Sequence, residues 1–184
     1  MIKVTLKGDV IKEYEAGTSI AEIAKSIGMG LYKSACGGKI NGNYCDLRTA
    51  VNEDCALEIV TFDEIEGKKT FWHTASHIMA EAVKRLFPEA KVAIGPAIED
   101  GFYYDFDREP FSREDLDAIE AEMKKIIKEG KRITRFTLPR EEAIALMKEK
   151  NEPYKVELIE DLPEDAEISF YDQEGFVDLC AGPH

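Results

Sequence analysis

The sequence lacks the features that mark membrane-spanning and exported proteins. None of its apolar runs approaches the roughly 20 residues that a helix needs to cross a bilayer. The first residues, Met1-Ile2-Lys3-Val4, alternate apolar and polar side chains instead of placing a basic stretch before an apolar core, so no export signal is visible. We therefore expect a soluble, cytoplasmic protein with no membrane partner.

Positive charge is also scarce. Acidic residues outnumber basic ones by 37 to 24, which gives a formal net charge of −13. Tight binding to nucleic acid needs Lys and Arg clustered against the phosphates, so we expect no extended basic surface and no DNA partner. Glycine-rich phosphate-binding signatures are missing as well, and no ATP site is visible.

Cysteine is too sparse for a disulfide framework. The four cysteines are Cys36, Cys45, Cys55 and Cys180, and in an apparently cytosolic chain their reduced chemistry is what matters. Apolar residues make up 44% of the chain and charged residues 33%, close to globular averages, so a real core is expected. The 184 residues suit one large domain or two small ones.

The first 62 residues carry the pattern of a small α+β module. Two alternating segments predict a half-buried β-hairpin, and a Ser-x-x-Glu capping box predicts the start of a short helix. An Asn-Gly turn and a closing apolar run predict further strands. These segments are residues 2–7 and 10–14, 19–27, 41–42 and 55–62. The order predicts a ubiquitin-like β-grasp, in which one helix covers a mixed sheet.

Residues 63–184 predict a second, α+β domain. The segment 63–69 is charged, contains a glycine and lacks apolar periodicity, so we expect a linker there. A helix is expected from Thr70 to Phe87, because Pro88 forbids its continuation. The remaining patterns predict strands at 91–95, 102–107, 131–138, 167–171 and 175–180 and helices at 112–130 and 140–150.

The chain has only three histidines, and all of them fall in two spaced pairs. His73 and His77 are four residues apart on a predicted helix, so they project from the same face. Cys180 and His184 repeat this spacing in a turn that contains glycine and proline. Only folding would bring the two pairs together, as is usual in enzyme sites.

The four residues allow more than one interpretation. Packed core histidines and inert buried cysteines are common, but the use of every histidine in the chain favours a site. A cysteine and three histidines could hold Zn²⁺, and a zinc-bound water has a pKa of about 7. Without metal, the same groups could position and deprotonate a water. Thr74 stands where zinc peptidases have glutamate, which disfavours peptidase chemistry.

Several motifs together resemble the N-terminal region of bacterial threonyl-tRNA synthetases over the whole chain. They are the β-grasp module, His73-x-x-x-His77, Ala93-Ile94-Gly95-Pro96, Gly101-Phe102-Tyr103-Tyr104-Asp105, Tyr154-Lys155-Val156 and Asp178-Leu179-Cys180-Ala181-Gly182-Pro183-His184. The resemblance implies a TGS domain at residues 1–62 and a tRNA-editing domain at 63–184. Such a domain hydrolyses serine mistakenly attached to threonine tRNA.

The resemblance also implies roles for single residues. The implied catalytic residues are His73, His77, Lys155, Cys180 and His184, and the implied substrate-binding residues are Gly95, Tyr104 and Asp178. Lys155 and Cys180 would hold or activate the attacking water, and His73 would sense the seryl side chain and the ribose. Asp178 would bind the ammonium group of the aminoacyl ester. The pocket must be small, because serine and threonine differ by one methyl group, worth about 1 to 3 kcal/mol.

Cofactors and partners follow from the same resemblance. Editing is expected to need no cofactor, although related alanine-tRNA editing proteins share both pairs and bind zinc; the metal ligands would then be His73, His77, Cys180 and His184. The catalytic core, which ligates threonine to tRNA with ATP, and the anticodon-binding domain would lie beyond residue 184. Mischarged tRNA would dock mainly through those absent domains, and the full-length enzyme would be a homodimer.

Two other functions stay open at this point. The chain could be a zinc-stabilised structural or interaction module, in which the four ligands close a metal site. It could also be the front end of a different fusion enzyme with a vestigial editing pocket.

Overall fold

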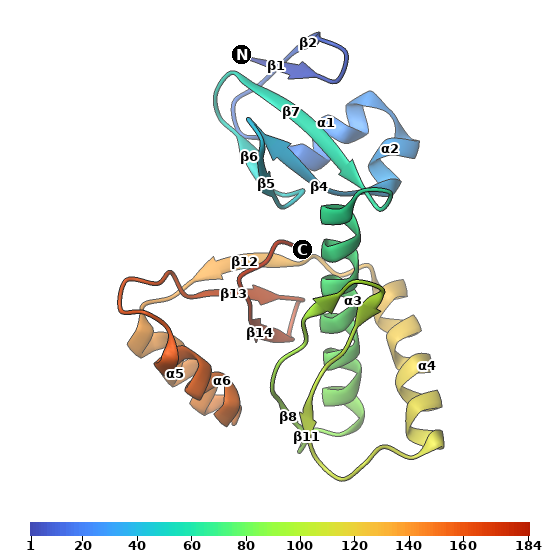
Figure 1. Ribbon diagram of the computed structural model, residues 1–184, viewed down its shortest axis with the longest axis vertical. Coiled ribbons are helices and arrows are strands. Elements are labelled where there is room, and N and C mark those ends of the chain that lie inside the picture. Colours follow the sequence, from blue (N-terminus) through green and yellow to red (C-terminus); the bar gives the residue numbers. More distant parts are fainter. The chain divides into compact units, whose positions relative to one another are not determined.

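The chain forms two compact units, and the computed structural model describes all residues from 1 to 184. The first unit contains Met1–Trp72 and Gly182–His184, and the second contains His73–Ala181. The colours of Figure 1 follow the chain from the N-terminus (blue) to the C-terminus (red). The domain boundary predicted between residues 62 and 63 stays a prediction.

A five-stranded mixed sheet forms the first unit, with the strand order β2-β1-β7-β4-β5. Strands β1 and β7 are parallel, and the other neighbours are antiparallel. The strands are β1 (Ile2–Leu6), β2 (Val10–Tyr14), β4 (Ala35–Ile40), β5 (Asn43–Cys45) and β7 (Cys55–Thr61). A ribbon of β3 (Thr18–Ser19) and β6 (Ala50–Val51) and the helices α1 (Ile20–Ile27) and α2 (Met29–Ser34) complete it. The predicted α+β class and β-grasp are confirmed.

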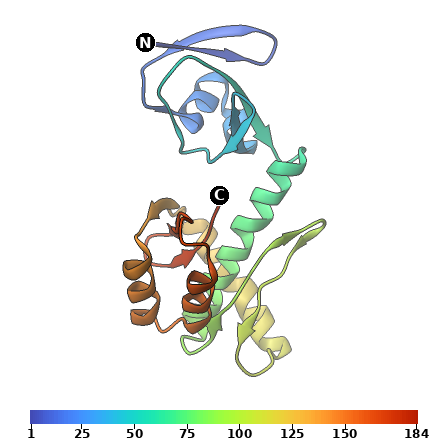
Figure 2. The ribbon, with the colours of Figure 1, turned by 60° about the vertical axis from the view of Figure 1, so that its left-hand side comes forward.

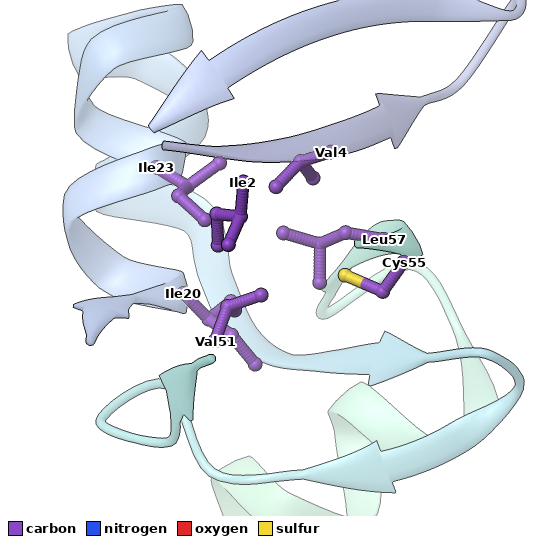
Figure 3. Close-up of a cluster of buried hydrophobic side chains, with 7 residues drawn as sticks. All are labelled: Ile2, Val4, Ile20, Ile23, Val51, Cys55 and Leu57. Carbon is purple, nitrogen blue, oxygen red and sulfur yellow. The ribbon is translucent and has the colours of Figure 1, made fainter. Parts of the chain in front are cut away.

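Helix α1 covers one face of this sheet. It starts with the predicted capping box, in which Ser19 accepts a hydrogen bond from the Glu22 backbone and Glu22 accepts one from the Ser19 backbone. Ile20 and Ile23 are completely buried, and each contributes about 1.5 to 3 kcal/mol of hydrophobic free energy. Figure 3 shows them in one buried cluster with Val4 and Leu57 of the sheet.

Helix α3 (Ile65–Leu86) starts earlier than predicted, so residues 65–69 are helical and not a linker. The charged residues of this segment are good helix formers, which apolar periodicity alone does not reveal. Gly67 is required by packing, because a Cβ there would stand 1.9 Å from the carbonyl oxygen of Thr61. The helix ends just before Pro88, as predicted.

The second unit combines the rest of α3 with three small sheets and three further helices. A three-stranded antiparallel sheet has the order β12-β13-β14, and two ribbons pair β8 with β11 and β9 with β10. The strands are β8 (Lys91–Val92), β9 (Ala97–Ile98), β10 (Gly101–Phe102), β11 (Phe106–Asp107), β12 (Thr134–Thr137), β13 (Ser169–Asp172) and β14 (Val177–Leu179). The helices are α4 (Arg113–Glu129), α5 (Arg140–Glu149) and α6 (Pro153–Asp161).

Lys155 lies on helix α6, which the sequence patterns do not predict. Asn151, with a φ of 56°, separates α5 from α6, and Pro153 stands at the start of α6, where its missing N–H costs nothing. Helices α5 and α6 lie side by side in both views (Figures 1 and 2). The strand predicted at 102–107 is divided into β10 and β11.

Helix α3 packs against α4 through apolar and charged contacts. Ala82 and Val83 of α3 belong to one buried cluster with Ile119 and Ile126 of α4. Beside them, Arg85 donates hydrogen bonds to Glu81, Glu122 and Glu129 at 2.7 to 3.1 Å. These contacts fix the helix that carries His73 and His77. No helix of the chain combines the length and apolar character of a membrane span.

We predict that Gly67→Ala destabilises the protein by about 1 to 3 kcal/mol, because the added methyl group collides with the backbone of Thr61. Urea unfolding followed by circular dichroism measures this change. Gly30→Ala is the matched control, since Gly30 also lies in a helix but a Cβ there meets nothing within 4 Å. It should raise stability by about 0.5 to 1 kcal/mol. Equal shifts of both variants in the same direction would contradict the packing argument.

Candidate active site

The face of α3 that lies in the second unit presents His73 and His77 together. Their ring centroids are 5.0 Å apart, and the ring planes are inclined by 67°. His77 is almost fully buried, at 4% exposure, whereas His73 is half-buried. The four-residue spacing therefore places two imidazoles one helical turn apart.

Cys180 joins this pair from a distant part of the chain. Its Sγ lies 3.2 Å from Nε2 of His73, although 107 residues separate them. The position of Cys180 is fixed just after β14, because its backbone N–H donates to the Ser169 carbonyl and its own carbonyl accepts the Ser169 hydroxyl at 2.6 Å. The ligand-type atoms of His73, His77 and Cys180 lie within 4.8 Å of one another.

His184 belongs to the tail Gly182–His184, which groups with the first unit. Its backbone N–H donates to the Asp46 carboxylate at 2.6 Å. The participation of its imidazole in the site with the other three residues stays a prediction.

A second group of buried polar side chains surrounds Asp178 on β14. Lys155 of α6 forms a salt bridge with Oδ1 at 2.8 Å, and the hydroxyl of Tyr104 donates to Oδ2 at 2.8 Å. Nδ1 of His77 lies 3.3 Å from the same Oδ2, and Nζ of Lys155 also donates to the Tyr104 oxygen at 3.2 Å. Four separate segments of the second unit thus meet at one carboxylate that is 2% exposed.

Charge pairing controls the protonation of Asp178. Burial by itself would raise the pKa of its carboxyl, but the nearby Lys155 and His77 and the hydrogen bonds from Lys155 and Tyr104 outweigh burial and hold the pKa below its usual range. The same environment raises the pKa of Tyr104, through burial and the adjacent Asp178 charge. Asp178 is therefore ionised and Tyr104 neutral at cellular pH.

His77 is a neutral imidazole in this site. Burial lowers its pKa to about 4, and the attraction of Asp178 only partly opposes this shift. A carboxylate facing Nδ1 favours the tautomer with the proton on that nitrogen. Nε2 then keeps its lone pair, so it can accept a proton or bind a metal ion.

The residues also fit a zinc ion by donor type. Donors bound to one tetrahedral zinc lie about 3.3 to 3.8 Å apart, and the Cys180–His73 distance of 3.2 Å is close to this range. The upper bound of 4.8 Å for the set exceeds it, so the side chains would have to draw together to hold zinc. Two imidazoles and a thiol are a suitable donor set for this metal.

The structure adds residues that sequence reasoning missed. Ser76 is completely buried on α3, and its hydroxyl reaches the carbonyl oxygen of Gly95 at 3.0 Å. Glu152, just before α6, is buried, accepts the Val92 N–H and forms a salt bridge with Lys84 at 2.6 Å. A single serine or glutamate has no pattern of its own, and only their burial distinguishes them. The predicted pocket residue Gly95 lies against the Tyr104 ring.

Comparisons with known proteins show which proteins the chain resembles. The family model of the TGS domain matches residues 2–61 of the chain. Threonine–tRNA ligases of Acetivibrio thermocellus and Clostridium perfringens are 61% and 64% identical over the whole chain, which spans 29% and 28% of their lengths. The ligase of Caldanaerobacter subterraneus is 60% identical over 98% of the chain and 28% of its own length. The chain is therefore similar over its whole length to bacterial threonine–tRNA ligases, spans less than a third of their length, and carries a match to the TGS domain at residues 2–61.

Proposed function

We propose that residues 63–184 form an editing domain that hydrolyses serine from mischarged threonine tRNA. The observation that carries this proposal is the convergence of His73, His77 and Cys180 beside the buried Asp178–Lys155 pair. Ester hydrolysis needs a base for the attacking water and fixed polar groups around the ester. A neutral imidazole, a thiol and a buried amine supply groups of these kinds.

In this mechanism the water is bound near Cys180 and Lys155, and the neutral imidazole of His77 accepts its proton. His73, whose Nε2 lies 3.2 Å from the Cys180 sulfur, is placed beside the seryl side chain and the ribose. His184 follows Cys180 by four residues, so the chain keeps the Cα atoms of the two residues within about 14 Å of each other. We propose His184 as the fourth group around the ester.

Asp178 has both carboxylate oxygens in use, which favours an orienting role. Its contacts with Lys155, Tyr104 and His77 hold these three side chains in place. We propose that Asp178 acts through them. The contact with the aminoacyl ammonium that the family resemblance implies would require the substrate to exchange one of these interactions.

A zinc-dependent site is the second candidate, favoured by the clustering of the ligand-type atoms. His73, His77 and Cys180, with His184 as the fourth ligand, would hold the ion. Bound zinc would supply a Lewis acid and a more acidic water, or would stabilise the fold without catalysis.

The proposed activity of the whole protein extends beyond this chain. The relatives are named threonine–tRNA ligases and are more than three times as long as the chain. We propose that the full-length, cytoplasmic, homodimeric protein ligates threonine to tRNA with ATP through its other regions. Those regions would also provide most of the tRNA docking, since this chain carries a net charge of −13.

The first test compares hydrolysis of seryl- and threonyl-tRNA by the 184-residue chain. We expect the seryl ester to be hydrolysed at least about tenfold faster, because a small pocket excludes the extra methyl group. Activity that survives chelator treatment of metal-free protein would remove the zinc mechanism. No hydrolysis of either ester, together with zinc-dependent melting, would instead favour the structural module.

Replacement of Cys180 tests the thiol. We expect Cys180→Ala to slow seryl-tRNA hydrolysis about a hundredfold, because the attacking water loses a group that holds it. Cys36→Ala is the matched control, since Cys36 lies in β4 of the first unit and should leave the rate within about twofold. Thermal melting of both variants checks the fold. Full activity of Cys180→Ala would contradict the assigned role.

The acid sensitivity of the fold tests the environment of His77. The unfolded chain binds a proton at His77 near pH 6.5, but the folded chain binds it only near pH 4. Stability should therefore be complete above pH 6.5 and decline as the pH falls toward 4, by up to about 3 kcal/mol. Urea unfolding in chelator at several pH values measures this loss. His77→Gln should have a shallower slope over the same range, and an identical slope would refute the assignment.

A further inference from the structure

Ser76 connects the histidine helix to the segment 93–96. Its side chain is completely buried, and its hydroxyl lies 2.7 Å from the carbonyl oxygen of His73. Serines often make such a local contact within a helix. The same hydroxyl also lies 3.0 Å from the carbonyl oxygen of Gly95, which is 19 residues away and outside the helix. One hydroxyl proton is therefore shared between the helix and this segment.

Gly95 forms a close contact with an aromatic ring. A Cβ at this position would stand 2.0 Å from Cδ2 of Tyr104, so only glycine allows the backbone to approach the ring. The flanks of the contact are held by backbone hydrogen bonds from Ala93 to Asp105 at 3.0 Å and from Asp105 to Ile94 at 2.9 Å. The carbonyl of Gly95 has the Ser76 hydroxyl as its link to α3.

The opposite end of the Tyr104 ring belongs to the buried polar group. Its hydroxyl donates to Asp178 and accepts from Lys155. A continuous series of contacts thus runs from α3 through Ser76 and Gly95 to Tyr104, and from there to Asp178. These contacts join the residues that we propose for catalysis to Gly95, for which the family resemblance implies a role in substrate binding.

We propose that Ser76 is a positioning residue that determines the specificity of the editing site. It holds the segment 93–96, which contains Gly95 and which we call the pocket wall, against helix α3. The inference rests on the proposed seryl-tRNA hydrolysis. Serine and threonine differ by one methyl group, so a pocket rejects threonine only if its wall does not yield when that group enters. A buried hydroxyl bonded to the wall restricts this movement.

Removal of the hydroxyl acts on the wall more than on the reacting groups. Ser76→Ala deletes a single oxygen and leaves the carbonyl of Gly95 without this donor. This carbonyl is partly buried, so the loss of its donor leaves it unsatisfied, and a movement toward another donor or water lowers the free energy. The wall then becomes more mobile, and threonyl ester is refused less well.

The test measures single-turnover hydrolysis of seryl- and threonyl-tRNA by the 184-residue chain and by its Ser76→Ala variant. We expect the ratio of the threonyl rate to the seryl rate to rise about three- to tenfold, which is part of the discrimination that one methyl group provides. A merely structural effect would lower both rates together and leave this ratio unchanged.

Two further variants sharpen the test. Ser34→Ala is the matched control, because the Ser34 hydroxyl contacts only carbonyls of its own helix, those of Gly30 and Leu31; its ratio should equal that of the unmodified chain. Ser76→Cys keeps a weaker donor and should fall between serine and alanine.

The outcomes separate this inference from the function on which it rests. Selective seryl hydrolysis by the unmodified chain, with the same ratio in Ser76→Ala, would overturn the inference alone. Absence of seryl hydrolysis in the unmodified chain would overturn the proposed function and the inference with it.

Discussion

The buried salt bridge between Lys155 and Asp178 is the constraint on which the site depends. The two side chains are 4% and 3% exposed, and their charged atoms are 2.8 Å apart. Removing one partner from such a pair typically costs about 3 to 5 kcal/mol, because the other charge is left buried and uncompensated. The pair therefore keeps α6 and β14 in place, and Tyr104 and His77 are arranged around it.

This constraint explains why the imidazole of His77 stays neutral beside a carboxylate. An exposed histidine next to an aspartate would have a raised pKa, but here burial dominates and the Lys155 charge adds to it. The negative charge of Asp178, which favours protonation of His77, is already balanced by the positive charge of Lys155. A neutral imidazole at cellular pH is the chemical result.

The predictability of the structure differed between local and long-range features. The capping box at Ser19, the helix end before Pro88 and the β-grasp follow from local sequence rules, and the structure confirms them. The prediction of a linker at 63–69 was wrong. Glycine is needed at position 67 because the backbone there contacts β7, and not because the segment is flexible. Nothing in the neighbouring sequence distinguishes Lys155 from an exposed surface lysine, and only the tertiary packing shows that it is buried. The pairing of Cys180 with His73 likewise depends on chain segments 107 residues apart.

The arrangement around Asp178 also limits which sequence changes this region can tolerate. Neither oxygen of its carboxylate is left over, so a change at Lys155, Tyr104 or His77 alters the surroundings of the other two. Effects of substitutions at these positions are coupled and will not add. In related sequences, these residues are therefore expected to change together, with one substitution compensating for another, and rarely one at a time. Correlated substitution, more than strict invariance, would be the evolutionary mark of this site.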